Sequence, residues 1–421
     1  MDTSEHSMAL RLPQELVDHI IDHLHDELMT LQNCARVCRA WTPASRFHLF
    51  AKVSLKAASP QNGPALPQER CKRLHALLVQ CPEIISNIRE LEVCEGSPLH
   101  HPYSDVQSST TWVTTERTLT ALFKMLTHVK RFDFSATSLQ FWTLLPPTFQ
   151  NALYALLSLP TLSYIRLHSW HFPSFSTLVS FLSHCQNLRA FALSSTNIGN
   201  DGDGSDLDIT PAPEGKEEKR ATPLEVLTLD FVSFAYLEYW LLGRAAMVDI
   251  RYLRELRVSH FHDVEIIEKL LLAVGDTLEH LHLKPGIWNV RPFNLSVNSG
   301  LRSIRLTLDD PATAMEWTIA LLSTITGNNT ALERVGLEFY ADPKKITGWS
   351  DLDSLFMQPG LGSLKQVEIG LFAIPTHGDF VAVKEEMNGL AGKDCVRWYQ
   401  LGIKSQRSSR QLTPRISRYE S

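Results

Sequence analysis

The chain has 421 residues, of which 44% are hydrophobic and 20% are charged, a composition typical of a folded protein. Its length exceeds that of one ordinary compact core and predicts either two domains or a repeat array. The net charge of −6 and the pI of about 6.3 provide no global positive field for nucleic acid or for an anionic membrane.

The cysteines and the apolar segments indicate the compartment. Seven cysteines without a C-x-x-C pair are typical of reduced thiols. The N-terminus lacks the basic segment and apolar run of a signal peptide. No apolar stretch approaches the roughly 20 residues that cross a bilayer, and the run from Leu270 to Val274 stops at Gly275. We therefore expect a soluble protein, cytoplasmic and/or nuclear, with no membrane or nucleic-acid partner.

Residues 9–50 contain three apolar patterns at helical spacing. Pro13 suits the first turn of a helix, Thr30 can cap a second helix, and Pro43 can open a short third helix. The first two apolar stripes are Leu16, Val17, Ile20, Ile21 and Leu24, and then Leu31, Cys34, Ala35, Cys38 and Trp41. So small a unit has too little interior to bury all these side chains, so a partner or the next domain must cover some of them.

The order and spacing of these residues resemble the F-box motif, in the form abundant in fungal F-box families. The matching segments are Leu12-Pro13-x-Glu15-Leu16, Ile20-Ile21-x-x-Leu24 and Val37-Cys38-Arg39-x-Trp41, within a tenth of the chain. The resemblance implies binding of a Skp-type adaptor, which connects to a cullin scaffold and a ubiquitin-conjugating enzyme. By motif position, the residues that contact the adaptor are Leu12, Pro13, Leu16, Ile20, Leu24, Leu31, Val37, Cys38 and Trp41.

Some of these residues have an alternative role, which is only to hold the three helices together. We prefer that interpretation for three further apolar residues, Ile21, Ala35 and Phe47. His19 and His23 stand four residues apart, a spacing that can hold a metal. We interpret them instead as part of the solvated face of an amphipathic helix, and we expect no metal and no cofactor.

A six-residue pattern, L-x-x-L-x-L, recurs ten times beyond residue 87. It starts at Ile88, Val129, Leu162, Leu188, Leu224, Leu253, Leu278, Leu301, Leu332 and Leu364. Segments of helical period follow several of these starts, at 119–126, 178–182, 266–274 and 315–325. A short strand and a helix that repeat in this way predict a leucine-rich-repeat solenoid. The competing doubly wound sheet should carry phosphate loops, and the sequence has none.

These patterns predict an α/β fold in four parts. We expect a three-helix F-box at residues 9–55, a linker and junction helix at 56–87, an irregular leucine-rich-repeat solenoid at 88–400 and a basic tail at 401–421. The solenoid should have parallel strands on its concave face and helices outside. Residues 199–222, almost without apolar side chains, should form a disordered insertion.

The sequence carries no motif of a common enzyme class. A nucleophile elbow, a Walker phosphate loop, a dinucleotide-binding turn and an H-E-x-x-H zinc motif are all missing. We therefore expect a binding protein and no enzyme. It is either the substrate receptor of a cullin-type (SCF) ubiquitin ligase or a binding scaffold whose F-box serves assembly without ubiquitin transfer.

The fifth residue of each hexapeptide should project from the concave face. In order these residues are Glu92, Asp133, Arg166, Ala192, Thr228, Arg257, His282, Arg305, Gly336 and Glu368. Since arginine pairs with carboxylate and phosphate, we hypothesise that an acidic or phosphorylated segment of an unknown target protein binds near Arg166, Arg257, His282 and Arg305. The alternative is that these are solvated strand residues without a common ligand.

Overall fold

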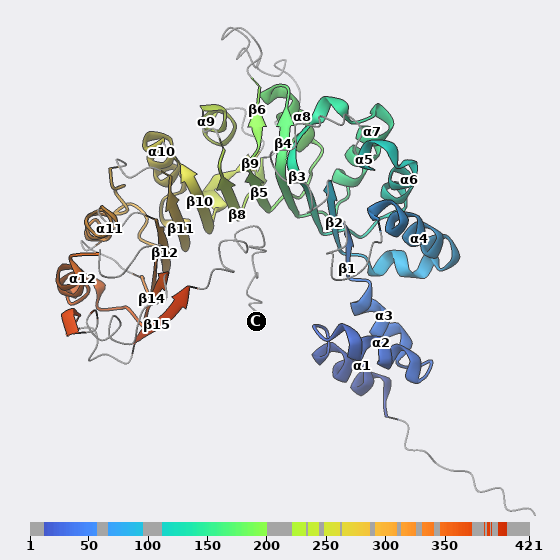
Figure 1. Cartoon of the computed structure of the whole chain (residues 1–421), viewed down its shortest axis with the longest axis horizontal. Helices are drawn as coiled ribbons and strands as arrows, with labels where there is room; N and C mark the ends of the chain where they lie inside the picture. Colours follow the sequence, from blue (N-terminus) through green and yellow to red (C-terminus); the bar gives the residue numbers. More distant parts are fainter. Residues whose placement is uncertain are drawn as a thin grey trace, which may run out of the picture. The chain divides into compact units, whose positions relative to one another are not determined.

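The computed structural model describes residues 12–56, 66–95, 112–199, 221–232, 235–243, 248–261, 263–286, 291–309, 313–325, 331–340, 346–372, 383, 385–387, 389 and 395–401. Two compact units divide the chain. Unit 1 comprises residues 1–188 and 195–209, and unit 2 comprises residues 189–194 and 210–421. Both are α/β, with parallel strands and with helices on the outside (Figure 1). No helix in the described ranges is long and apolar enough to cross a membrane.

Unit 1 begins with three short helices and continues as a parallel sheet. Its helices are α1 (Gln14–His23), α2 (Leu28–Val37), α3 (Thr42–Leu49), α4 (Pro67–Gln80), α5 (Trp112–Thr115), α6 (Arg117–Met125), α7 (Pro147–Leu157) and α8 (Phe175–Ser183), with 3-10 turns η2 (Pro82–Asn87) and η3 (Trp142–Leu144). Its strands are β1 (Lys52–Leu55), β2 (Glu90–Glu95), β3 (Arg131–Phe141), β4 (Tyr164–Phe172) and β6 (Asn197–Ile198). The strands β1, β2, β3 and β4 pair in chain order, and β6 pairs with β4.

Unit 2 repeats the alternation of strand and helix. Its strands are β5 (Ala190–Ser194), β7 (Thr222–Pro223), β8 (Val226–Asp230), β9 (Val248–Asp249), β10 (Glu255–Phe261), β11 (His280–Pro285), β12 (Ser303–Leu308), β13 (Arg334–Phe339), β14 (Gln366–Phe372) and β15 (Val396–Leu401). Its helices are α9 (Ala235–Leu242), α10 (Val264–Val274), α11 (Ala314–Ser323) and α12 (Trp349–Phe356), with 3-10 turns η4 (Ile250–Tyr252), η5 (Gly275–Thr277) and η7 (Pro359–Leu361).

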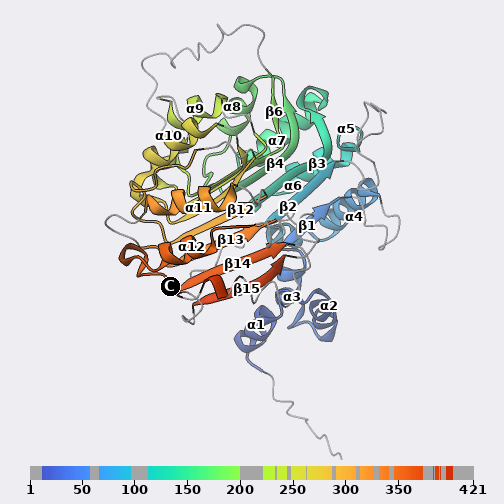
Figure 2. The ribbon, with the colours of Figure 1, turned by 60° about the vertical axis from the view of Figure 1, so that its left-hand side comes forward.

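The main sheet of unit 2 follows the order β5, β8, β10, β11, β12, β13, β14 and β15, all parallel, while β7 and β9 form a separate pair. Figure 2 shows β12 to β15 side by side in that order. The strands of this main sheet therefore lie side by side in chain order, with helices between many of them.

Each of the ten hexapeptides falls on a strand, and the pattern correctly predicted the core. All residues in its fourth and sixth positions are buried, from Leu91 and Val93 in β2 to Val367 and Ile369 in β14. The first position is also buried except at Leu364, which is half-buried. Because side chains alternate along a strand, the fifth positions share the opposite face. The register confirms this arrangement by aligning Arg257, His282 and Arg305 on adjacent strands.

The first and last strands in the chain, β1 and β15, have no counterpart among the ten hexapeptides. Residues 52–55, which we expected in the helical module, form β1 and pair with β2. The hexapeptide Phe50-x-x-Val53-x-Leu55 marks this strand but precedes the range in which the repeat was recognised. At the other end, β15 has Val396 and Trp398 in the fourth and sixth positions but Lys393 in the first, so its pattern is incomplete.

The helices match the sequence except at the second helix, where α2 ends at Val37 and leaves Cys38 and Trp41 of the predicted stripe beyond it. The apolar segments at 119–126, 178–182, 266–274 and 315–325 correspond to α6, α8, α10 and α11. The prediction that Thr30 caps the second helix is wrong, because α2 starts at Leu28 and Thr30 lies inside it. The insertion at 199–222 and the tail at 401–421 lie almost entirely outside the described residues, so both remain predictions.

A left-handed backbone recurs at one position of the repeat. Ser169, Ser195, Phe231 and His260 have φ of 60°, 48°, 51° and 54°. Each is the eighth residue counted from a hexapeptide start, in four successive repeats. In β10 this residue coincides with a shift of register against β11. A local bend therefore follows β5 and β8 and lies within β4 and β10. It is formed by residues other than glycine, at a cost of roughly 1–2 kcal/mol each.

Candidate docking surface on the N-terminal helices

The three N-terminal helices have a small core of their own. Val17, Ile21 and Leu31 are buried in it, and Leu24, Trp41, Ala44 and Leu49 pack partly buried against it. The burial of Ile21 confirms our interpretation of that residue. Leu31, which the motif position assigned to the adaptor, is fully buried. The assignment of Leu31 therefore needs correction, because its side chain is enclosed by the neighbouring helices and presents no surface to a partner.

Other apolar side chains of α1 and α2 remain open to solvent. Leu12, Leu16, Ile20 and Val37 are between 41% and 62% exposed. Pro13 and Cys38 are also exposed, whereas Ala35 is half-buried. We define the N-terminal apolar surface as Leu12, Leu16, Ile20, Leu28, Met29 and Val37, all exposed large hydrophobic residues. Sequence reasoning missed Leu28 and Met29, because they precede the apolar stripe of the second helix. A concentration of exposed apolar side chains on so small a module indicates a docking surface.

Hydrogen bonds fix α1 against the rest of the module. The side-chain amide of Gln14 donates to the carboxylate of Asp18 at 2.7 Å and to the carbonyl of Ala40 at 2.9 Å. The imidazole of His48 in α3 lies 2.7 Å from the carboxylate of Asp22. The bonds from Gln14 to Ala40 and from His48 to Asp22 each join residues 26 positions apart in the sequence. They hold the exposed face of α1 in one orientation.

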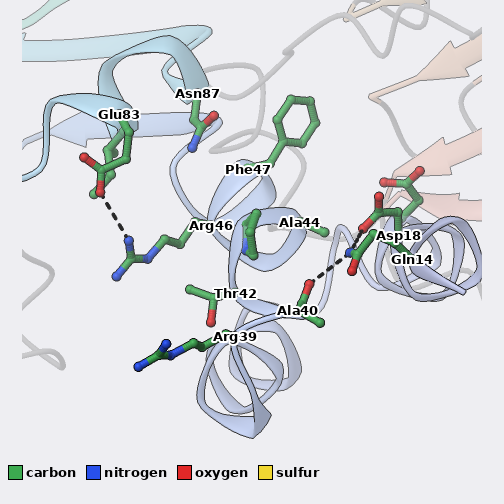
Figure 3. Close-up of a pocket in the computed structure, with 13 residues that line it drawn as sticks. Gln14, Asp18, Arg39, Ala40, Thr42, Ala44, Arg46, Phe47, Glu83 and Asn87 are labelled. Atoms are coloured by element: carbon green, nitrogen blue, oxygen red, sulfur yellow. Dashed lines mark hydrogen bonds and ion pairs between the residues drawn. The ribbon is translucent and has the colours of Figure 1, made fainter. Parts of the chain in front are cut away.

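A cleft of about 840 Å³ separates α1 from the turn into α3 and from η2. Figure 3 shows Gln14 and Asp18 on one side of it, and Arg39, Arg46 and Glu83 on the other. Its lining residues are Gln14, Asp18, Asp22, Arg39, Ala40, Thr42, Pro43, Ala44, Arg46, Phe47, Glu83, Ile84 and Asn87. The cleft is thus acidic on its α1 wall and mixed in charge on the opposite wall.

The helix α3 connects the module to the sheet. Arg46 pairs with Glu83 of η2 at 3.5 Å, and the guanidinium of Arg89 lies 3.9 Å from the ring centre of Phe47. We expected a junction helix at 56–87 to provide this seat. The helix in that range, α4, packs against β1 and α6, and the residues that meet α3 are those of η2. Phe47, which we expected to hold the three helices together, instead packs half-buried against Arg89.

The proposed target residues are divided between the two units. Arg166 lies in unit 1, while Arg257, His282 and Arg305 lie in unit 2. The guanidinium of Arg166 pairs with the carboxylate of Asp133 at 3.4 Å, and both side chains are largely enclosed. Burial raises the pKa of Asp133, and the nearby Arg166 partly opposes that rise. Arg166 is therefore engaged within the sheet face of unit 1.

The two candidate arginines of unit 2, Arg257 and Arg305, are also paired. Arg257 forms an ion pair with Glu255 of its own strand. Arg305 binds two carboxylates, of Glu338 at 3.4 Å and of Glu368 at 3.1 Å. An acidic target would have to compete with these internal carboxylates. The excess of positive charge on which our hypothesis depended is therefore largely compensated within the face itself.

His282 lies between these cations as a neutral base. Burial, and then the charges of Arg257, Arg305 and Lys284, lower its pKa from 6.5 to about 3. Its Nε2 atom lies 3.1 Å from the hydroxyl of Thr307, which itself donates to the carboxylate of Glu338 at 3.1 Å. Because that hydroxyl proton is already donated, Nε2 must carry the hydrogen that His282 donates. The face is a connected polar network with little free charge.

Within the described ranges, no three histidine, cysteine or carboxylate side chains converge as metal ligands. The N-terminal apolar surface is the candidate docking site. No protein-family model and no curated protein matches this chain.

Proposed function

We propose that this chain is the substrate-recognition subunit of a cullin-type (SCF) ubiquitin ligase. Residues 9–50 act as an F-box that binds a Skp-type adaptor, and the repeats bind the target protein. The adaptor contacts are the exposed residues Leu12, Pro13, Leu16, Ile20, Val37 and Cys38, with the half-buried Leu24 and Trp41 at the margin. Leu31 is excluded because it is buried.

The observation that carries the proposal is the split of the apolar residues of α1. Val17 and Ile21 close the core of the module, while Leu16 and Ile20 on the same helix stay exposed. Complete burial of a large apolar side chain contributes about 1.5–3 kcal/mol. The half-exposed residues of the N-terminal apolar surface together could contribute on the order of 6 kcal/mol to docking, enough to drive association when polar contacts add to it.

The repeats support the second half of the proposal. A parallel strand and an outer helix recur along both units, and the hexapeptide residues fill the core of each. We interpret this arrangement as an irregular leucine-rich-repeat solenoid that starts at β1, earlier than the sequence pattern indicated. Its polar strand face, with paired charges of both signs, is suited to a protein partner.

A scaffold without ubiquitin transfer is the second candidate, because it requires the same adaptor surface. The two functions differ in whether a cullin joins the complex. Purification of the tagged full chain from cells, with the proteasome inhibited, should recover the adaptor and a cullin together. Recovery of the adaptor without a cullin would favour the scaffold. A Leu12→Ala and Pro13→Ala double variant that still captured the adaptor fully would contradict both.

A further inference from the structure

Two histidines of α1 lie closer together than a solvated polar face requires. The Nε2 atoms of His19 and His23 are 3.3 Å apart, and their ring centres are 4.6 Å apart with the planes at 72°. The residues are one helical turn apart, and both side chains are exposed. The helix therefore places the two residues on one face, and both side chains face solvent.

The distance matches the geometry of a tetrahedral metal centre. Zinc binds imidazole nitrogens at about 2.0–2.1 Å, so two such nitrogens at a tetrahedral angle lie about 3.3–3.4 Å apart. We propose that His19 and His23 bind a divalent metal ion of the zinc class through their Nε2 atoms. This proposal replaces our expectation of a purely solvated face, which rested on spacing alone.

The histidine pair lies beside the N-terminal apolar surface, so a metal ion bound there could also contact a docked partner. Residues three and four apart on a helix are surface neighbours, so His19 and His23 border Leu16 and Ile20 of the N-terminal apolar surface. Across the described part of the chain, no third protein ligand joins the two histidines. The remaining coordination positions are filled by water, and a docked partner can replace a water with its own side chain.

A hydrogen bond between the two rings is the competing explanation of the short distance. In that case one Nε2 carries a hydrogen and the other accepts it. Metal binding requires instead that both rings carry their hydrogen on Nδ1, leaving both Nε2 lone pairs for the ion. It also requires neutral rings, so acid must weaken it. The two explanations therefore differ in the response of the protein to zinc.

Calorimetric titration of the full chain with Zn²⁺ at pH 7.5 tests the proposal. His19→Gln and His23→Gln should each remove one binding event, while His128→Gln, which removes an exposed histidine elsewhere in unit 1, should retain it. Titrations of His19→Gln or His23→Gln that match the wild type, or a wild type without such an event, would overturn it.

The adaptor is absent from this titration, so its result is independent of the proposed ubiquitin-ligase function. Failure of metal binding would leave the adaptor surface in place, and failure of adaptor capture would leave the metal site in place. Circular dichroism of each variant checks that α1 remains folded. Because both histidines are exposed, we expect their substitution by glutamine to leave the helix content unchanged.

Discussion

The side chain of Arg305 crosses over Gly336 to reach Glu368 two strands away. The register aligns the three residues, and a Cβ atom at Gly336 would lie 3.3 Å from the Nε atom of Arg305. Tyr399 crosses Gly370 in the opposite direction and donates to the carboxylate of Glu338 at 3.1 Å. A Cβ atom at Gly370 would lie only 2.7 Å from the tyrosine ring. Both glycines leave room for contacts that span a strand.

The two glycines therefore predict different responses to alanine. Gly370→Ala should destabilise the protein by about 1–3 kcal/mol, because the Tyr399 ring must move and lose its bond to Glu338. Gly336→Ala should cost less than about 1 kcal/mol, because the flexible Arg305 side chain can give way. Urea unfolding of the two variants measures the difference. Equal costs would show that the crossing of Tyr399 is unimportant.

The polar network makes stability depend on pH through His282. The folded imidazole stays neutral down to a pKa of about 3, whereas in the unfolded chain it takes a proton near its ordinary value of 6.5. The unfolded state therefore binds more protons between these values, and stability falls as the pH drops through this window. We expect a loss of about 1–2 kcal/mol from this group by pH 5.

Unfolding experiments at pH 7 and pH 5 on the wild type and on His282→Gln measure this contribution. The variant should lose less stability over the same interval, whatever its stability at pH 7. An identical loss in both proteins would mean that His282 is not held neutral by its surroundings.

The core of the N-terminal module predicts a contrast between two leucines. Leu31 is fully buried, whereas Leu16 is 50% exposed. Leu31→Ala should destabilise the module by about 2–5 kcal/mol, because it removes buried methyl groups and leaves a cavity. Leu16→Ala should cost well under half as much. Hydrogen exchange of the α1–α3 amides reports the local loss, and similar exchange in both variants would contradict the core that we describe.

The left-handed residues predict stabilisation by glycine. Ser195 has φ of 48°, a conformation that costs roughly 1–2 kcal/mol for residues other than glycine. Ser195→Gly should stabilise the protein by up to about 1 kcal/mol, since the greater freedom of glycine in the unfolded chain offsets part of the gain. Ser195→Val should destabilise it, because a β-branched residue tolerates this conformation worst. Thermal unfolding of both variants and the wild type tests this order of stability. A valine variant more stable than the wild type would contradict the prediction.

The sequence predicted those features that depend on local periodicity. Alternation along each strand identified Leu281 and Leu283 as core residues and His282 as a residue of the opposite face. Helical spacing could not show which apolar residues of α1 are buried and which are exposed, because the exposure of Leu16 depends on where α2 and α3 pack.

Contacts between distant repeats were equally hidden from the sequence. The pair of Arg305 and Glu368 spans 63 positions, and it requires both the strand register and the glycine between them. The left-handed residues had no signal either, because none of the four is a glycine. The fifth residues of the hexapeptides suggested a basic surface around the arginines, but only the structure showed which carboxylates neutralise them.

Capture of the adaptor tests the central claim most directly. A Leu16→Ala and Ile20→Ala double variant of the full chain should lose binding of a purified Skp-type adaptor by at least about tenfold, or about 1.4 kcal/mol. Leu272→Ala provides the matched control, because this leucine is 66% exposed on α10 and outside the N-terminal module. The control should bind the adaptor as the wild type does. Unchanged affinity of the double variant, or no measurable binding by the wild type, would contradict the account.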